Sequence, residues 1–273
     1  MSKQDIKYYL GIDIGSTATK VVLLDDEQIV EYFVLPTGWS SKEVAEEVQQ
    51  HLIKQGYDFS NIYVIATGYG RVAVDFADQI ITEISCHGRG GYELMQKDCS
   101  MIDIGGQDTK IITVENGRVV NFLMNDKCSA GTGKFLEIMA NRLGVNLEEL
   151  FDLAVEGEVL PISAMCTVFA ESEVISHIGN GEKRADIAAG VVDSVVKRVA
   201  GLAQRHGLNR QSIFLSGGLC DSEFIIEALG KELRSDIQSN PLGRYAGAYG
   251  AALLARDSEM KRRRKEASLA QKA

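Results

Sequence analysis

Two Asp-x-Gly turns, ninety residues apart, carry the side chains best suited to chemistry in this sequence. Asp13 and Asp103 each end an apolar stretch, and Gly15 and Gly105 follow two residues later. Glycine lets the main chain approach a ligand closely, and the free N–H groups of such a turn bind oxyanions. A divalent metal on phosphate prefers oxygen ligands and retains waters, which two carboxylates can anchor. The two turns therefore predict a site for a nucleotide phosphate and its Mg²⁺.

The two turns belong to an internal repeat. Residues 11–30 read GIDIGSTATKVVLLDDEQIV and residues 101–120 read MIDIGGQDTKIITVENGRVV, which align without a gap. A repeat of this length indicates a duplicated supersecondary unit. Each copy is expected to form a strand, a tight polar turn, a second strand and a hairpin. A glycine after a strand is usually only structural, but the duplication favours a functional interpretation.

Other donors near the turns complete the predicted site. The residues assigned to cofactor binding here are Gly15, Ser16, Thr17, Thr19, Lys20, Gly105, Gly106 and Gln107. Gln107 is assigned to position the hydrolytic water, with Asp103 as the candidate base and Asp13 as its metal-holding partner. This assignment fits phosphoryl transfer, which depends mainly on positioning and charge stabilisation.

Strands and helices alternate along the rest of the chain. We expect helices over residues 40–54, 134–143, 167–178, 186–205 and 246–255, and strands over residues 62–66, 80–84 and 212–215. A turn at residues 86–88 is expected to lead into a further helix ending near residue 96. This alternation, with its duplicated start, predicts an α/β fold. The predicted domains are residues 1–98 and 99–258, with a final helix at about 245–258 packing back on the first half, and a basic tail over 259–273.

Composition narrows the function classes. The 273 residues are 45% hydrophobic and 25% charged, which is ordinary for a globular protein with a substantial core. The net charge of −9 argues against nucleic acid as the main ligand. No stretch is apolar for long enough to cross a membrane, and the first residues lack a signal-peptide pattern, so we expect a cytoplasmic protein. The basic run at residues 261–265 is interpreted as a frayed, solvated terminus.

A third turn, Ser216-Gly217-Gly218, follows the strand expected over residues 212–215. Together, DIGST (13–17), DIGGQ (103–107) and LSGG (215–218) resemble the phosphate-1, phosphate-2 and adenosine motifs of the actin, sugar-kinase and heat-shock-chaperone ATPase superfamily. The resemblance implies two ribonuclease-H-like halves that form a clamp around ATP. It also implies that Gly217 and Gly218 lie flat against the nucleoside, and Pro241 is assigned to the same cofactor site. The Walker and dinucleotide-binding patterns fit poorly.

Two cysteines lie just before predicted helices. Cys128 is in the segment NDKCSAGTG (125–133), and Cys166 begins the segment CTVFAESEV (166–174). The start of a helix carries free N–H donors and about half a positive charge, which favours a thiolate and suits an anionic metal–thiolate cluster. A four-iron cluster ordinarily takes four thiolates, so a two-fold homodimer would have to supply the other two.

Simpler interpretations of the cysteines remain open. The alternative to a cluster is that Cys128 and Cys166 are buried, unreactive residues of the core. Cys86 or Cys99 could complete a cluster within one subunit, although neither has the same setting, and these two and Cys220 are interpreted as structural.

With these segments, a closer resemblance emerges. TGYGR (67–71), NDKCSAGTG and CTVFAESEV are similar to segments of the activators of 2-hydroxyacyl-CoA dehydratases, and the similarity runs from about residue 8 to 256. ATP-dependent activating subunits of benzoyl-CoA reductase and of double-cubane cluster proteins are relatives of this family. The resemblance implies a homodimer that holds one [4Fe-4S] cluster through Cys128 and Cys166 of each subunit. It implies a reduced ferredoxin or flavodoxin as electron donor and an iron–sulfur dehydratase or reductase as acceptor, with ATP hydrolysis changing the angle between the cluster-bearing helices.

Two other functions fit the same turns. A small-molecule kinase, such as an amino-sugar kinase, would need a substrate base but neither Cys128 nor Cys166. A nucleotide-dependent interaction module would need no cluster. Iron content and colour of anaerobically purified protein distinguish both from the electron-transfer interpretation.

Overall fold

The computed structural model describes residues 6–163, 166–208 and 211–270. The chain divides into two compact units, which are described separately below. The first unit comprises Met1–Lys97, Asn116–Val119 and Arg244–Ala273, and the second comprises Asp98–Glu115 and Val120–Gly243. The C-terminal helix therefore falls in the first unit, and the two cysteine segments fall in the second.

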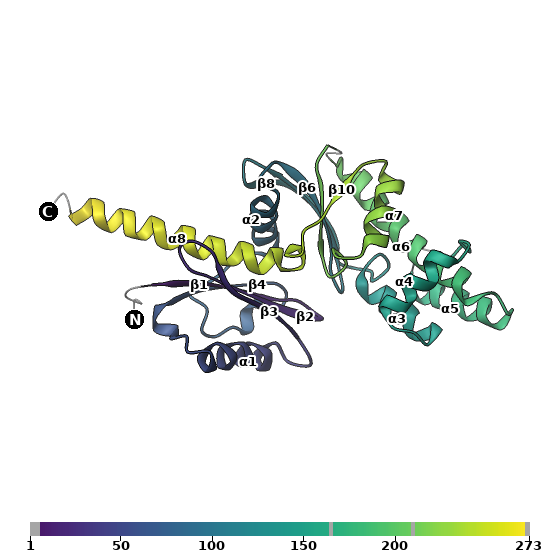
Figure 1. Cartoon of the computed structure of the whole chain (residues 1–273), viewed down its shortest axis with the longest axis horizontal. Coiled ribbons are helices and arrows are strands. Elements are labelled where there is room, and N and C mark those ends of the chain that lie inside the picture. The colour runs from purple at the N-terminus through teal and green to yellow at the C-terminus, as the bar shows by residue number, and fades with distance from the viewer. Residues whose placement is uncertain (1–5, 164–165, 209–210, 271–273) are drawn as a thin grey trace. The chain divides into compact units, whose positions relative to one another are not determined.

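The first unit is built on a mixed five-stranded sheet of order β3-β2-β1-β4-β5. Its strands are β1 (Tyr8–Ile14), β2 (Ala18–Leu24), β3 (Ile29–Pro36), β4 (Ile62–Thr67) and β5 (Gln79–Ile80). Apolar side chains on β1, β2 and β4 form a core with α1 (Ser41–Lys54), which buries Val44, Val48 and Leu52 at helical spacing as the sequence predicts. β1 pairs antiparallel with β2 and parallel with β4 (Figure 1).

The second unit repeats this sheet. Its strands are β6 (Cys99–Ile104), β7 (Thr109–Glu115), β8 (Arg118–Asn125), β9 (Ile213–Gly217) and β10 (Ile237–Gln238). Their order is β10-β9-β6-β7-β8, which is the order of the first sheet read from the other edge. Five helices accompany it: α3 (Gly133–Leu143), α4 (Leu147–Glu156), α5 (Thr167–Gly179), α6 (Arg184–His206) and α7 (Glu223–Leu233). The α/β fold class with duplicated halves is confirmed.

The strand registers are equivalent in the two units. Asp13 lies opposite Lys20 on β2, and Asp103 lies opposite Lys110 on β7. On the parallel side, Asp13 lies beside Thr67 of β4, and Asp103 beside Ser216 of β9. Because side chains directly opposite each other on neighbouring strands are in contact range, the register alone sets a lysine and a hydroxyl near each aspartate.

The region of residues 80–96 differs from the expectation. Of the strand expected over residues 80–84, only Ile80 lies in a strand, the two-residue β5 (Gln79–Ile80). The turn expected at Cys86-His87-Gly88 is wrong, because these residues lie within α2 (Glu83–Met95). The glycines of α2 allow close helix packing: a Cβ atom on Gly90 would lie 2.0 Å from the Ala246 carbonyl oxygen. A glycine that tertiary packing requires looks in sequence like a turn signal.

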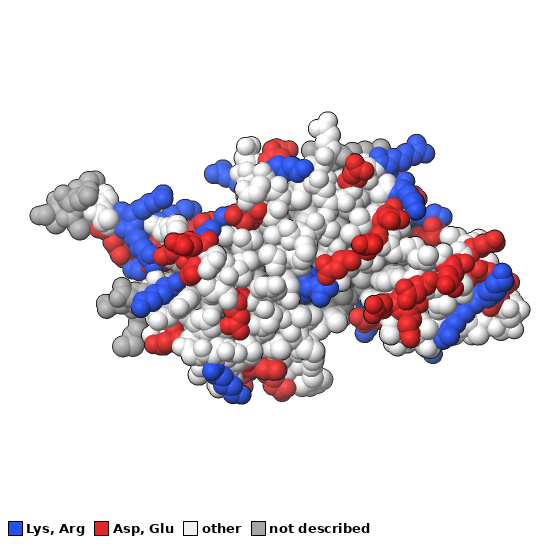
Figure 2. Space-filling model, in the orientation of Figure 1, with Lys and Arg blue, Asp and Glu red and all other residues white. Residues whose placement is uncertain are grey.

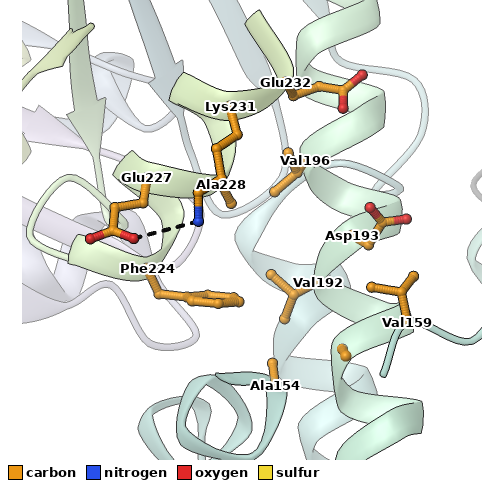
Figure 3. Close-up of a pocket in the computed structure, with 11 residues that line it drawn as sticks. Ala154, Val159, Val192, Asp193, Val196, Phe224, Glu227, Ala228, Lys231 and Glu232 are labelled. Carbon is orange, nitrogen blue, oxygen red and sulfur yellow. Dashed lines mark ion pairs between the residues drawn. The ribbon is translucent and has the colours of Figure 1, made fainter. Parts of the chain in front are cut away.

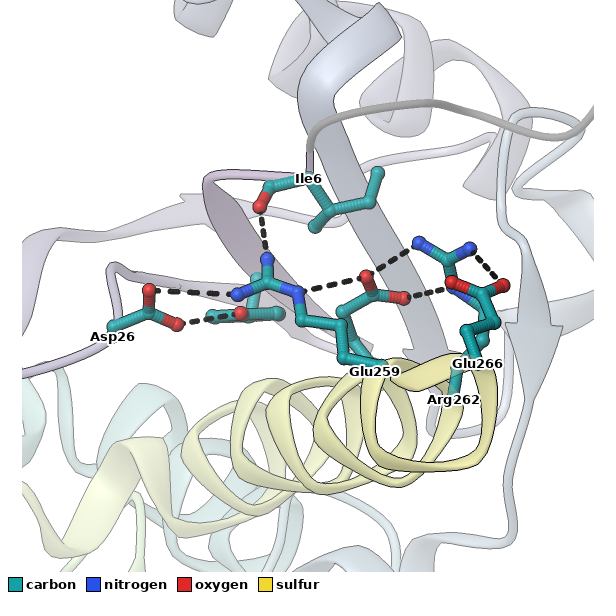
Figure 4. A network of polar contacts seen from close by, with 7 residues as sticks. Ile6, Asp26, Glu259, Arg262 and Glu266 are labelled. Carbon is teal, nitrogen blue, oxygen red and sulfur yellow. Dashed lines mark hydrogen bonds and ion pairs between the residues drawn. The ribbon is translucent and has the colours of Figure 1, made fainter. Parts of the chain in front are cut away.

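The C-terminal helix α8 (Ala246–Ala270) is longer than the predicted 246–255, and its first part packs on β1 and α2 (Figure 1). The basic run is therefore helical, and the frayed terminus expected there is wrong. The buried carboxylate of Glu259 accepts hydrogen bonds from Arg262 and Arg263, and Arg263 also donates to the Ile6 carbonyl (Figure 4). Figure 2 shows Lys and Arg side chains gathered along this distal part of the helix.

Within the ranges that the structure describes, no helix has both the length and the apolar character that a membrane span requires.

Candidate functional site

In the phosphate-2 turn of the second unit, the carboxylate of Asp103 is buried and bonded to side chains. Asp103 is the penultimate residue of β6 and is only 2% exposed. Its Oδ1 accepts a hydrogen bond from the Ser216 hydroxyl at 2.8 Å, and its Oδ2 lies 3.2 Å from the Lys110 ammonium. Lys110 also pairs with Asp108 Oδ1 at 2.8 Å. Both oxygens of the predicted base therefore have a partner in the same unit.

The phosphate-1 turn of the first unit is built differently. Asp13 is 5% exposed, and two glycines enclose its carboxylate. A Cβ atom on Gly68 would lie 2.4 Å from Oδ1, and one on Gly247 would lie 2.5 Å from Oδ2. Lys20 stands opposite on β2, yet the described residues include no ion pair between it and Asp13. Backbone, rather than charged side chains, bounds this carboxylate.

The hydroxyl residues of the first turn divide into two groups. Ser16 is half-buried and Thr17 is exposed at the turn, where both can meet a ligand. Thr19 is fully buried, and its hydroxyl lies 3.0 Å from the Thr37 hydroxyl. Thr37 in turn donates to the Gly15 carbonyl at 2.7 Å. Thr19 and Thr37 thus support the turn from behind, a role that the prediction of direct cofactor contact for Thr19 did not include.

In the second turn, backbone groups are held by the start of α3. The Gly133 and Lys134 amides donate to the carbonyls of Gly105 and Gly106, at 3.0 and 2.9 Å. The Gly105 amide donates to the Asp108 carbonyl at 2.9 Å, which closes the turn. Gln107, predicted to position water, is exposed at its tip. The turn and the start of α3 are therefore joined directly by backbone hydrogen bonds.

The turn at the end of β9 is also tightly made. Gly217 has φ of +87°, and a Cβ atom there would lie 2.3 Å from the Ile104 carbonyl oxygen. The Gly218 amide donates to that carbonyl at 3.1 Å, and Gly218 itself is exposed with open space around it. Pro241, in the loop after β10, is exposed. The structure thus presents Gly218 and Pro241 on the surface of the second unit.

An equivalent turn in the first unit was not recognised from the sequence as a repeat. Gly68 after β4 has φ of +84°, and a Cβ atom on it would lie 2.6 Å from the Ile14 carbonyl oxygen. The Gly70 amide donates to that carbonyl at 2.9 Å. The sequence signal for this second repeat is a hydroxyl residue followed by glycine, as in Thr67-Gly68 and Ser216-Gly217.

The loop of Cys128 connects β8 to α3 and is hydrogen-bonded to β7 beside the phosphate-2 turn. The Thr109 hydroxyl donates to the Gly131 carbonyl at 2.7 Å, which anchors the loop on β7. Within the loop, the Asn125 amide donates to the carbonyl of Cys128 at 3.0 Å, and the Thr132 hydroxyl donates to the carbonyl of Ser129 at 2.7 Å. Cys128 is half-buried against the core. Its position is therefore tied to the turn by a short series of hydrogen bonds.

The loop before α5 lies against the same segment. Cys166 is the N-cap residue of α5 and is half-buried. The hydroxyls of Ser129 and Thr167, the residues that follow the two cysteines, are 2.7 Å apart. The structure therefore brings the two predicted cluster segments together in one unit.

The other three cysteines are enclosed. Cys86, Cys99 and Cys220 are buried. Burial raises the pKa of the Cys86 thiol to about 12, with a smaller contribution from nearby Asp13, so it is not a thiolate at neutral pH. In the described part of the chain, no group of three or more His, Cys, Asp or Glu side chains could hold a metal ion.

A groove of about 380 Å³ lies elsewhere in the second unit, between α4, α6 and α7. Val192, Val196 and Phe224 form its apolar floor, and the Lys231–Glu227 ion pair lies at its rim (Figure 3). None of the predicted phosphate or cysteine residues lines it.

Two sheets of one strand order, each with an Asp-x-Gly turn against a Gly turn, define a duplicated nucleotide-binding fold of the actin and sugar-kinase superfamily. The ethanolamine utilization protein EutJ from Carboxydothermus hydrogenoformans shares this fold, with a TM-score of 0.59 over 92% of this chain and 91% of that one, at 15% identity. Over residues 10–255 the sequence matches the BadF/BadG/BcrA/BcrD ATPase family, and the chain belongs to this family.

Individual relatives are similar over nearly their whole length. The (R)-2-hydroxyglutaryl-CoA dehydratase activating ATPase of Acidaminococcus fermentans is 42% identical over 91% of this chain and 96% of its own. The activator of lactoyl-CoA dehydratase of Anaerotignum propionicum is 42% identical over 93% of this chain and 100% of its own. The activator of the 2-hydroxyisocaproyl-CoA dehydratase from Clostridium difficile, solved with bound ADPNP, superposes with a TM-score of 0.87 at 40% identity, covering 94% and 97% of the two chains.

Proposed function

We propose that this chain is an ATP-hydrolysing iron–sulfur activator, which passes a low-potential electron to a partner iron–sulfur enzyme such as a 2-hydroxyacyl-CoA dehydratase. The observation that carries the proposal is the hydrogen-bonded connection within the second unit between the phosphate-2 turn and the Cys128 loop. ATP hydrolysis at the turn can displace that loop only if the two are mechanically joined. Three of the relatives are named as activators of 2-hydroxyacyl-CoA or lactoyl-CoA dehydratases, which supports the choice of partner.

The turn residues fit Mg²⁺-bound nucleotide. Asp13 and Asp103 offer the oxygen donors that Mg²⁺ prefers, and binding through retained waters suits carboxylates that are already enclosed. The half-buried Ser16 and the exposed Thr17 and Gln107 are the side chains assigned to phosphate and water. The ADPNP bound to the Clostridium difficile activator supports nucleotide binding by the same turns. When bound, the metal would neutralise phosphate charge, and this chain's residues would position the water.

The cysteine segments fit a cluster only as half of its ligand set. Cys128 and Cys166 are half-buried on adjoining loops, and their thiols are a suitable donor type for iron. Two thiolates from one chain leave a four-iron cluster short of ligands, so we assign the other two to a second copy, as a homodimer. The cluster would supply one-electron storage and release at low potential.

The surface of α5 supports the homodimer. Val168, Phe169 and Ile175 are all more than half exposed on this helix, directly after Cys166. Large apolar side chains gathered on one exposed helix are typical of an interface, and a second copy would cover them. The proposed dimer thus buries the segment that holds the cluster.

The coupling follows from the contacts of the second unit. Loss of the γ-phosphate changes the preferred position of the phosphate-2 turn, because ATP and ADP differ in affinity for its two positions. The Gly133 and Lys134 amides transmit that shift to α3, and the Ser129–Thr167 contact transmits it to α5. Hydrogen bonding and exposure at the sulfurs of Cys128 and Cys166 would tune the reduction potential of a cluster held there.

Donor, acceptor and compartment complete the proposal. A reduced ferredoxin or flavodoxin would supply the electron. A 2-hydroxyacyl-CoA dehydratase would receive it, and a double-cubane cluster protein or a benzoyl-CoA reductase is the alternative acceptor. The cytoplasm of an anaerobic cell would keep both the thiols and the cluster reduced.

The test is iron content and mass of the protein purified without oxygen. We expect a brown dimer with about four iron atoms per dimer. Cys166→Ala and Cys128→Ala should each lose the iron but retain nucleotide binding, and Cys99→Ala, which changes a buried thiol, should keep it. A colourless monomer would contradict the proposal, and a phosphorylated small molecule formed by iron-free protein would favour the kinase alternative.

A further inference from the structure

Lys110 is a buried cation whose role the proposed function does not explain. It is 4% exposed and lies between Asp103 and Asp108, at 3.2 and 2.8 Å. Its repeat equivalent, Lys20, stands in the same register opposite Asp13 but forms no such pair in the described residues. The repeats differ at one informative place: Asp108 corresponds to Ala18.

The second carboxylate explains the difference. Burying a lysine ammonium costs free energy unless it is paired with an opposite charge. Two carboxylates compensate for the lost hydration of the ammonium better than one does. The closer of its two partners is Asp108, so Lys110 retains a full ion pair if it leaves Asp103. Asp103, by contrast, has Ser216 on Oδ1 and Lys110 on Oδ2, so Lys110 covers the oxygen that a metal-bound water would need.

We propose that Lys110 is a positioning residue that occupies Oδ2 of Asp103 until a magnesium nucleotide arrives, and then moves onto Asp108. The inference rests on the proposed nucleotide site and adds its regulation. Entry of the metal exchanges one cation for another, so Asp103 is never left as an unpaired buried charge. Nucleotide without metal offers no cation to replace the ammonium, and Lys110 then stays in place. The second unit would thereby distinguish magnesium nucleotide from free nucleotide.

The experiment measures affinity, by calorimetry, for ADP with Mg²⁺ and for ADP with a chelator, using the full chain. Removing the competing cation in Lys110→Met should tighten Mg·ADP binding by about fivefold or more, a modest coupling, and leave binding of metal-free ADP unchanged. Removing the second partner in Asp108→Asn should weaken Mg·ADP binding by a similar factor, because it removes the ion pair onto which Lys110 would move. Circular dichroism checks that each variant is folded.

The matched control is Lys20→Met in the other repeat. Lys20 has no carboxylate pair to release, so its loss should weaken ADP binding equally with and without metal. Weaker Mg·ADP binding by Lys110→Met would mean that Lys110 is a phosphate ligand, and unchanged binding would mean a purely structural ion pair. Either result overturns the inference. Unchanged or tighter Mg·ADP binding by Asp108→Asn also overturns it. If Lys110→Met does not fold, the result for Asp108→Asn alone decides. If the unmodified protein binds no ADP, the proposed function fails instead.

Discussion

The two repeats share their strand order and their register, yet they surround the same aspartate in opposite ways. Gly68 and Gly247 enclose the carboxylate of Asp13 in the first unit, and the described residues include no ion pair between Asp13 and Lys20. Lys110 and Ser216 bond Asp103 in the second unit, so both of its oxygens are occupied by side chains. The two copies share the sheet and the turn, whereas the residues around the aspartate differ, with Asp108 in one copy where the other has Ala18.

The segments inserted between the strands differ even more. Between β3 and β4 the first unit has the α-helix α1, but between β8 and β9 the second unit has α3 to α6 and both cysteines proposed to hold the cluster. The insertion starts with hydrogen bonds to the phosphate-2 turn itself. Under the proposed function, the first turn would bind nucleotide, and the second would both bind it and transmit its state to the cysteine segments.

The largest expected effect separates the two aspartates. Asp103→Asn should lower the ATPase turnover number by about 10²–10⁴-fold, because it removes the candidate base and the partner of Lys110. Asp13→Asn should chiefly weaken Mg²⁺–nucleotide affinity, because its surroundings offer only anchoring. Phosphate release at saturating ATP and equilibrium binding of Mg·ADP measure the two effects. Equal losses of turnover in both variants would remove the distinction between the units.

The glycine turns should respond alike in the two units. Gly68→Ala and Gly217→Ala each combine a positive φ with a Cβ atom that meets a backbone carbonyl, and each should lower the free energy of unfolding by about 2–4 kcal/mol. Gly56→Ala and Gly207→Ala are matched controls, because they share the positive φ but have nothing within 4 Å of the added Cβ. The controls should cost only about 1 kcal/mol in urea denaturation. Similar losses for tests and controls would mean that the carbonyl contact has no energetic weight.

Cysteine alkylation should distinguish the two cysteines of the inserted segments from the three buried cysteines. Without metal, Cys128 and Cys166 should react with iodoacetamide, and the buried Cys86, Cys99 and Cys220 should react only after unfolding. With its pKa raised to about 12, Cys86 holds roughly 10³-fold less thiolate than an ordinary cysteine, even before access is considered. Raising the pH from 7 to 9 should therefore leave Cys86 unmodified. Peptide mass spectrometry against time measures this, and early labelling of Cys86 would show that α2 opens.

The smallest expected effect concerns pH. His206 of α6 lies 2.7 Å from the Thr113 hydroxyl of β7, where the repeat equivalent in β2 is the apolar Leu23. Burial lowers the pKa of His206, so its neutral form is favoured by folding. The resulting stability is present above the ordinary histidine pKa and is lost as pH falls through it towards the lowered value. His206→Gln should flatten this part of the pH dependence of urea midpoints by no more than about 0.5 kcal/mol. A steeper dependence in the variant would reverse the sign assigned here.

Much of the fold follows from local sequence patterns. The alignment of residues 11–30 with 101–120 predicted two equivalent sheets, because strand periodicity and the Asp-x-Gly turn are short-range features. The same local features located Asp13, Asp103, Cys128 and Cys166. Their roles in catalysis and iron binding stay predictions until the experiments above are done.

The sequence alone therefore predicts the duplicated strand–turn–strand units and the residue types in their turns. The tertiary structure decided which neighbours those turns have. Ser216 reaches Asp103 from 113 residues away, and the glycines of α2 pack against a helix near the other end of the chain. Such contacts depend on side-chain packing between distant segments, which leaves no periodic signal in the sequence. The physical difference is one of range: strand and turn patterns are encoded in neighbouring residues, whereas burial and ion pairing arise only when the chain is folded.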